Sequence, residues 1–301
     1  MQIRSFCLVL VAGLATAVAV PPPDDNWEKL PDGSFGQETE FHGVDGIAIP
    51  SYVRKPDGPG PFPVIILAHG GRYGKAPTMG MGRSPKGPAA DFIKARWAVY
   101  SIDYRPAETI SLPAIEYDDT VEAVKAVKKL PFVDPRRVGY MGGSHGAQVG
   151  ARVVARIDLS GAVLCAPAAM DLIEDKKAIE RGEKLVQILS KLIGDMEKQY
   201  GASAEEIDKD RKKFGYHSPI DDAAQVRCPL LIVNGLADDN SPPSIIRIYV
   251  RALRVAGKQV ETYEPPNMPH GFYFGRPEGP EYLESTRRSV EFFRKQFETA
   301  K

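Results

Sequence analysis

Residues 137–155 read RVGYMGGSHGAQVGARVVA, and this stretch decides the fold. It opens with the apolar run 137–142, which is typical of a strand buried on both faces. In the segment 145–156, small residues recur at helical spacing and predict a helix that lies close on a sheet. Those small residues are Gly146, Ala147, Gly150 and Ala151. Between strand and helix, Gly142 to Gly146 match G-x-S-x-G, a sharp turn that presents the Ser144 hydroxyl above the carboxyl end of the strand.

Apolar runs of the same style recur along the chain, and helical patterns lie between them. The expected buried strands are 63–69, 97–104, 162–166, 229–234 and a last strand at 260–266. The expected helices are 114–130, 242–256 with Ser241 as its N-cap, and 279–300 with Leu283, Val290, Phe293 and Phe297 turned inward. An antiparallel strand is expected at 47–54, with Pro50 at an edge of the sheet. Buried strands that alternate with helices predict an α/β domain with a mostly parallel central sheet flanked by helices.

One long stretch breaks this alternation. Residues 170–222 contain no convincing strand, are rich in Lys and Glu, and carry an apolar stripe at helical spacing. The stripe consists of Leu185, Ile188, Leu189, Leu192, Ile193 and Met196. An amphipathic helix of this kind needs a partner for its apolar side, so we expect a helical cap inserted over the carboxyl edge of the sheet. The alternative is that these helices are ordinary crossovers between strands.

The N-terminus has the pattern of an export signal. Within residues 1–19, a charged start is followed by an apolar run that ends in small residues. Cleavage is expected after Ala17 or Ala19, which predicts a secreted or periplasmic protein. An uncleaved membrane anchor is the alternative, although the run is near the lower limit of roughly 17–25 residues for a spanning helix. Residues 20–40 are expected to be an extended, weakly ordered segment before a domain at 41–301.

Composition excludes several kinds of protein. The chain has 301 residues with 39 basic and 39 acidic side chains, so it lacks the basic surface with which nucleic-acid-binding proteins neutralise phosphates. Three cysteines make no disulfide scaffold in a chain of this length, and no Cys/His group has zinc-ligand spacing. We therefore expect no metal, no nucleic-acid partner and no membrane span after signal cleavage. Cys165 and Cys228 are expected to be free, buried thiols.

A serine hydroxyl needs a base before it acts as a nucleophile. Among five histidines, His270 lies in the loop after the last expected strand, which ends at the same sheet edge as Ser144. The loop after strand 229–234 holds Asp238, which we expect to orient the histidine, with Asp239 as its immediate alternative. These aspartates also have a plain interpretation as caps of the next helix. The order Ser144, Asp238, His270 is the order found in α/β-hydrolases.

The loop after strand 63–69 completes the expected site. An oxyanion hole needs two backbone donors, and the expected ones are the N–H groups of His145 and Gly71. A plain turn at Gly70 and Gly71 is the alternative. The side chains expected to line the substrate pocket are Arg72, Tyr73, Tyr104 and Phe272, and each of them is equally compatible with ordinary surface or packing.

Four motifs in this order resemble a known superfamily. They are VRKPDGPGPFPVIILAHGG (53–71), VDPRRVGYMGGSHGA (133–147), CPLLIVNGLADD (228–239) and MPHGF (268–272). Together they resemble the catalytic domain of α/β-hydrolases, most closely the branch with prolyl oligopeptidase-type and dienelactone-hydrolase-type enzymes. The resemblance implies an α/β-hydrolase fold and a serine hydrolase that forms a covalent acyl-enzyme without a cofactor. Three departures stand out: no room for an oligopeptidase propeller, Asn234 where a histidine is usual, and Ser144 where dienelactone hydrolases use cysteine.

The sequence thus predicts an exported serine hydrolase that cleaves carboxylic esters through Ser144, His270 and Asp238. Its substrate is expected to be a small-molecule or polysaccharide-linked ester, with the acyl and alcohol groups and the oligomeric state left open. A serine peptidase with the same three residues is the first alternative, and the missing propeller argues against it. A hydrolase-fold protein that binds ligands without catalysis is the second, and the presence of all three residues argues against that.

Overall fold

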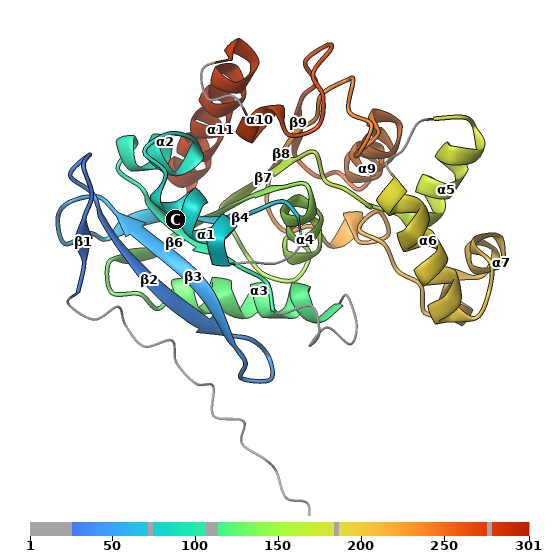
Figure 1. The fold of residues 1–301 in the computed structure, drawn as a ribbon, viewed down its shortest axis with the longest axis horizontal. Coiled ribbons are helices and arrows are strands. Elements are labelled where there is room, and N and C mark those ends of the chain that lie inside the picture. The colour runs from blue at the N-terminus through green and yellow to red at the C-terminus, as the bar shows by residue number, and fades with distance from the viewer. Residues whose placement is uncertain (1–25, 72–74, 106–113, 184–186, 276–278, 301) are drawn as a thin grey trace, which may run out of the picture.

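The structure, a computed structural model, describes residues 26–71, 75–105, 114–183, 187–275 and 279–300. Within them, nine strands form one sheet in the order β1-β2-β3-β5-β4-β6-β7-β8-β9 (Figure 1). Three antiparallel strands begin the sheet: β1 (Glu28–Lys29), β2 (Phe35–His42) and β3 (Ala48–Lys55). The remaining strands run parallel to one another: β4 (Phe62–Ala68), β5 (Ala98–Ile102), β6 (Val133–Gly143), β7 (Gly161–Cys165), β8 (Leu230–Val233) and β9 (Val260–Tyr263). This is the mostly parallel sheet of the α/β-hydrolase fold, as predicted.

Helices cover both faces of the sheet because its central strands are apolar on both sides. Along β4, Val64 and Ile66 pack with α3 (Ala114–Val127), α4 (His145–Val153) and α9 (Pro243–Val255). The alternate residues Ile65 and Leu67 pack with α2 (Pro88–Lys94) and α11 (Pro280–Thr299). Helices α1 (Lys75–Arg83) and α10 (Phe272–Gly275) precede α2 and α11, respectively, along the chain.

The segment 170–222, which was expected to form a cap and is called the cap below, is largely helical in its described residues. It comprises α5 (Leu172–Glu180), α6 (Gln187–Tyr200), α7 (Ala204–Lys209) and α8 (Arg211–Phe214), and a 3₁₀ turn (Ala223–Gln225) follows before β8. These helices lie to one side of the sheet, next to α9 (Figure 1). Ile193 and Met196 from the predicted stripe are buried in a separate apolar cluster with residues of α5 and α7. The cap therefore has a small core of its own, whereas Leu185 and the Ile188 side chain lie outside the described residues.

Several local predictions are wrong, each for a physical reason. Residues 28–40 belong largely to β1 and β2, and these strands were missed because β1 is short and β2 is polar at most positions between Phe35 and Phe41, which leaves no apolar run. Although β3 is an interior strand, Pro50 pairs only with β2, because β5 ends at Ile102 beside Ser51, so the edge position expected for Pro50 holds locally. Leu283 does not turn inward, because it is 55% exposed; Phe293 and Phe297 of the same helix are buried, as expected.

Other sequence expectations fall outside the described residues or are confirmed. The signal segment 1–19, with both cleavage sites, lies outside them. Both described cysteines, Cys165 and Cys228, are free and buried, as predicted. No helix in the described part of the chain has the length and apolar character needed to cross a membrane.

Candidate active site

Ser144 occupies the single position between the end of β6 and the first residue of α4. Its backbone has φ 52° and ψ −113°, a conformation that costs a residue with a side chain about 1–3 kcal/mol. The Ser144 N–H donates to the Cys165 carbonyl of β7 at 2.8 Å, and its own carbonyl accepts from the N–H groups of Ala147 and Gln148. The neighbouring strand and the new helix therefore hold the strained turn in place.

Two glycines make this turn possible. A Cβ on Gly142 would lie 2.3 Å from the Gly146 carbonyl oxygen, and one on Gly146 would lie 2.3 Å from that of Ala68. Real Cβ atoms do not approach an oxygen so closely, so any larger residue would force the helix and the two strands apart. The glycines of the predicted motif thus let α4 lie directly on the carboxyl ends of β4 and β6.

The structure brings the three predicted residues together at this edge. The Ser144 Oγ lies 2.9 Å from His270 Nε2, and His270 Nδ1 lies 3.0 and 2.9 Å from the two carboxylate oxygens of Asp238. Because a carboxylate only accepts hydrogen bonds, Nδ1 carries a proton and Nε2 is left to accept from the serine hydroxyl. His270 follows β9 and Asp238 follows β8, so each strand delivers one side chain.

Asp238 is buried, whereas the alternative acid, Asp239, is exposed. The Asp238 carboxylate also accepts hydrogen bonds from the N–H groups of Asn240 and Ser241 at 2.9 and 2.8 Å. Asp238 therefore does two things at once: it contacts His270, and it accepts hydrogen bonds from backbone N–H groups of the loop before α9. Ser241 is not the N-cap of that helix, because its hydroxyl donates to the Ala166 carbonyl and Pro242 takes the cap position.

The loop after β4 is held beside the nucleophile by a second histidine. His69 is buried, with Nε2 3.1 Å from an oxygen of Asp103 and Nδ1 3.0 Å from the carbonyl oxygen of Gly70. Both ring nitrogens face acceptors, and both hydrogen bonds form only when the ring carries two protons and pairs with Asp103 as an imidazolium. Sequence reasoning missed this pair, which forms between the ends of two neighbouring strands.

Fixing the Gly70 carbonyl also fixes the Gly71 N–H, because the two groups belong to one planar peptide and point in opposite directions. This peptide is close to the nucleophile, since a Cβ on Gly70 would lie 3.1 Å from the Ser144 Cβ. At the other predicted donor, the His145 N–H belongs to the first turn of α4, where backbone donors have no partner within the helix. The use of both N–H groups as an oxyanion hole remains a prediction.

Tyr104 and Phe272, which were expected to line the substrate pocket, pack instead against other parts of the protein. Tyr104 is buried and donates its hydroxyl to the His69 carbonyl at 2.7 Å, so it supports the loop instead of facing substrate. Phe272 packs in the apolar cluster with α11, whereas its neighbour Tyr273 places its ring edge against His270. Burial raises the pKa of Tyr273 well above its ordinary value, and the nearby Cys165 and Asp238 raise it further. Arg72 and Tyr73 lie outside the described residues.

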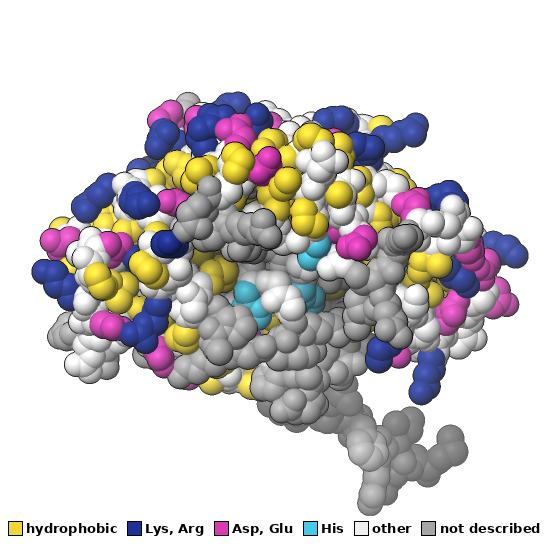
Figure 2. Space-filling model, turned by 45° about the horizontal axis from the view of Figure 1, so that its top comes forward, with side chains coloured by type: hydrophobic (Ala, Val, Ile, Leu, Met, Phe, Trp, Pro, Cys, Tyr) yellow, Lys and Arg dark blue, Asp and Glu magenta, His cyan; other side chains and the backbone are white. Residues whose placement is uncertain are grey.

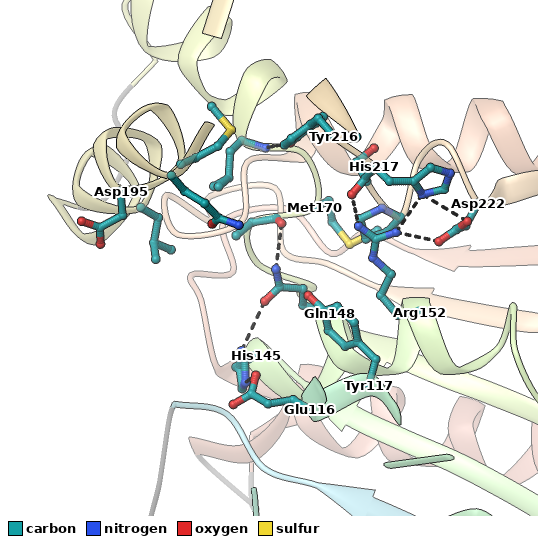
Figure 3. Close-up of a pocket in the computed structure, with 18 of the residues that line it drawn as sticks. Glu116, Tyr117, His145, Gln148, Arg152, Met170, Asp195, Tyr216, His217 and Asp222 are labelled. Carbon is teal, nitrogen blue, oxygen red and sulfur yellow. Dashed lines mark hydrogen bonds and ion pairs between the residues drawn. The ribbon is translucent and has the colours of Figure 1, made fainter. Parts of the chain in front are cut away.

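Beside the elbow lies a pocket of about 570 Å³ that sequence reasoning missed. It lies between α3, α4 and the cap, and its residues come from segments far apart in the chain (Figure 3). His145 lines it, with its side chain directed away from Ser144: Nε2 lies 3.2 Å from Glu116 and Nδ1 lies 3.2 Å from Gln148. In the space-filling view, histidine side chains lie in a hollow between apolar side chains (Figure 2). Within the described ranges, no three His, Cys, Asp or Glu side chains are placed to hold a metal ion.

Comparison with known proteins places the chain in a family. The model of the prolyl oligopeptidase family, Peptidase_S9, matches residues 99–300. The chain is 26% identical over 251 residues to the uncharacterized peptidase YuxL of Bacillus subtilis, covering 79% of this chain and 36% of YuxL. It is 30% identical over 156 residues to esterase EstD of Thermotoga maritima, covering 48% of this chain and 37% of EstD.

Among solved structures, the thermophilic esterase Est2 of Thermogutta terrifontis superposes with a TM-score of 0.62 at 20% identity. That superposition covers 86% of this chain and 94% of Est2, and at this identity it shows the shared fold. The chain spans little more than a third of the length of the two curated relatives it matches. The relatives thus include both a peptidase and esterases.

Proposed function

The chain belongs to the prolyl oligopeptidase family of serine hydrolases, and we propose that it is an exported member that cleaves carboxylic esters. The observation that carries this proposal is the unbroken series of hydrogen bonds from Ser144 through His270 to Asp238. A serine held on a strained turn and bonded to an oriented histidine is the arrangement expected of an activated nucleophile.

In the proposed mechanism, His270 Nε2 takes the Ser144 proton while the Ser144 Oγ attacks the ester carbonyl carbon. The carbonyl oxygen becomes an oxyanion that accepts hydrogen bonds from the N–H groups of Gly71 and His145. The carbon–oxygen bond to the alcohol then breaks, and His270 returns the proton to the leaving alcohol. Water attacks the acyl-serine by the same route and releases the acid.

Asp238 stabilises the imidazolium that forms in each step and keeps Nδ1 protonated. The His69–Asp103 pair has a different role, because it fixes the peptide that would donate from Gly71. Neither role needs a cofactor.

We prefer esters to peptides as the substrates of this chain. The likeness to EstD and Est2, both esterases by name, supports the same preference. Peptide hydrolysis is the second candidate, since the family is named for oligopeptidases and YuxL is named a peptidase. Export is proposed from the apolar segment within residues 1–19.

The test is steady-state turnover of p-nitrophenyl acetate and of a peptide p-nitroanilide. We expect ester turnover that falls by about a millionfold, to the background rate, in Ser144→Ala. Ser160→Ala is the matched control, since that exposed serine hydroxyl contacts only the Arg136 carbonyl. Ester turnover retained by Ser144→Ala would overturn the nucleophile assignment, and faster cleavage of the anilide would establish the peptidase instead. A wild-type chain inactive on both would support a non-catalytic binding protein.

Export is tested separately, by expressing the full chain in a bacterium and sequencing the N-terminus of the mature protein. A mature chain that starts at Val18 or Val20 agrees with cleavage after Ala17 or Ala19. A chain that keeps Met1 and stays with the membrane fraction would establish the anchor alternative.

A further inference from the structure

A second cavity, of about 400 Å³, lies between helix α9 and the last two strands of the sheet, β8 and β9. Strand β9 ends the sheet (Figure 1), and its alternate residues Thr262 and Glu264 face this cavity. Its volume lies within the range of small-molecule sites, about 300–1,000 Å³. We call it the α9 cleft, and it is separate from the proposed active site, because Ser144, Asp238 and His270 do not line it.

Arginine side chains of α9 form one wall of the α9 cleft. Arg247, Arg251 and Arg254 line it, and their spacing along the chain puts them on one side of the helix. Arg247 Nε lies 3.0 Å from Glu264 Oε1, and Glu264 is the only acidic side chain among the described residues that line the cleft. Arg251 and Arg254 are exposed to solvent and have no acidic or carbonyl partner in the described ranges. The cleft therefore keeps two uncompensated positive charges.

Arginines without a partner are uncommon in this molecule. With the exception of Arg294 in α11, every other arginine that the structure describes pairs with an acidic side chain or donates to a backbone carbonyl. The negative end of the helix dipole accounts for one of the two in the cleft at most, because only Arg254 lies in the last turn of α9. Two adjacent free guanidinium groups at one cavity indicate a place for an anion.

The α9 cleft also exposes apolar surface. Val255 lines it together with Val250, and Val255 is 81% exposed, the highest value among the exposed large apolar side chains of the described residues. A single exposed valine on a protein surface needs no explanation, but this one adjoins two free positive charges. A ligand that satisfies both features carries a negative charge at one end of an apolar body.

We propose that the α9 cleft binds a small carboxylic acid with an apolar body. Its carboxylate accepts hydrogen bonds from Arg251 and Arg254, and its apolar body lies against Val250 and Val255. A guanidinium presents its donors as a planar fork that matches a carboxylate, and covering the exposed valine with carbon removes apolar surface from water. The inference goes beyond the proposed function and does not depend on it, because no residue of the ester-cleaving site takes part.

The first test measures the binding of defined probes to the full chain by isothermal titration calorimetry near neutral pH and at low salt. 3-Phenylpropionate carries both features, 3-phenyl-1-propanol has the same body without the charge, and acetate has the charge without the body. We expect 3-phenylpropionate to bind with a Kd of about 1 mM or lower, and the other two to bind at least about tenfold more weakly. Similar affinity for the alcohol or for acetate, or no binding of 3-phenylpropionate, would overturn the inference.

The second test locates the bound probe. Arg251→Met and Arg254→Met remove the charge and keep an apolar stem, and we expect each to raise the Kd for 3-phenylpropionate about threefold and the double variant to raise it about tenfold. Arg294→Met is the matched control, because Arg294 is also exposed and without a partner among the described residues but lies on α11, which packs on the opposite face of the sheet. It should leave the Kd unchanged.

Other outcomes of the same measurements would also overturn the inference. An unchanged Kd in the double variant would place the probe elsewhere, and an equal loss in Arg294→Met would mean a general attraction of anions to the protein. Inorganic phosphate that binds as tightly as 3-phenylpropionate would make charge alone sufficient. The thermal midpoints of the variants should match the wild type, because Arg251 and Arg254 have no partner in the described part of the chain. A midpoint lowered together with binding would assign the two arginines to the fold instead.

Discussion

Gly146 lies at the point where the nucleophile helix meets the strand that carries the predicted oxyanion loop. An added Cβ would lie 2.3 Å from the Ala68 carbonyl oxygen and 2.8 Å from that of His69. Gly146 has ordinary helical backbone angles, so Gly146→Ala tests space alone. Reaching a tolerable contact requires the helix and the strand end to separate by about 0.7 Å.

That separation would act directly on the site. Ser144 directly precedes helix α4 and the His145 N–H begins it, whereas the end of β4 leads into Gly70 and Gly71. A misplacement approaching 1 Å costs on the order of 100-fold in rate, and overpacking costs about 1–3 kcal/mol of stability. We therefore expect Gly146→Ala to lower kcat for p-nitrophenyl acetate about 100-fold and to lower the midpoint of thermal unfolding.

Gly194→Ala is the matched control, because Gly194 lies exposed in α6 and an added Cβ there meets no atom within 4 Å. It should leave turnover unchanged and raise stability by about 0.5–1 kcal/mol through its helix propensity. The assays are ester turnover and urea unfolding of the three proteins. Wild-type turnover and stability in Gly146→Ala would refute the close packing at the elbow and the reasoning built on it.

Two other substitutions test buried ionisable side chains. His69→Phe keeps an aromatic ring but loses the hydrogen bonds to Gly70 and Asp103. The kcat for p-nitrophenyl acetate should therefore fall about 10- to 100-fold with little change in KM. An unchanged kcat would show that the loop after β4 keeps its position without His69. Burial, with Asp171 and Glu174 nearby, raises the pKa of Asp175 in the cap to about 8. This carboxyl is then protonated in the folded protein, and its contribution to stability is complete at low pH and is lost as pH rises through about 8. The stability of the wild type falls between about pH 4, the pKa of an unfolded aspartate, and about pH 8, whereas Asp175→Asn has no proton to lose at this position. The thermal midpoint of Asp175→Asn relative to wild type should therefore be higher at pH 9 than at pH 5 by about 3 °C or more, and parallel pH profiles would contradict the buried acid.

Much of this architecture could be predicted from the chain because local signals agreed with one another. Continuous apolar runs mark strands buried on both faces, and parallel strands end at one edge, so Ser144, Asp238 and His270 were expected to meet there. The structure places them within hydrogen-bonding distance. The glycines of the elbow have close contacts of the kind that the motif requires.

Other features depend on contacts that no local pattern encodes. Ser241 has the residue type of a helix cap, but its hydroxyl is used by the Ala166 carbonyl, 75 positions earlier. Strand β2 joins the sheet although its residues are largely polar, because it pairs along its whole length with β3. The pocket at Glu116 is assembled from α3, α4 and the cap, so its chemistry appeared only once the chain was folded.

The central claim, that Ser144 is the nucleophile, is tested most directly by covalent labelling. A fluorophosphonate forms a bond from the Ser144 Oγ to phosphorus and loses fluoride, so mass spectrometry should find one adduct per chain on the peptide that contains Ser144. Ser144→Ala should take up no label, and His270→Ala should react far more slowly because the base is gone. A label on another residue, or ester turnover that continues in a chain fully labelled at Ser144, would contradict the account.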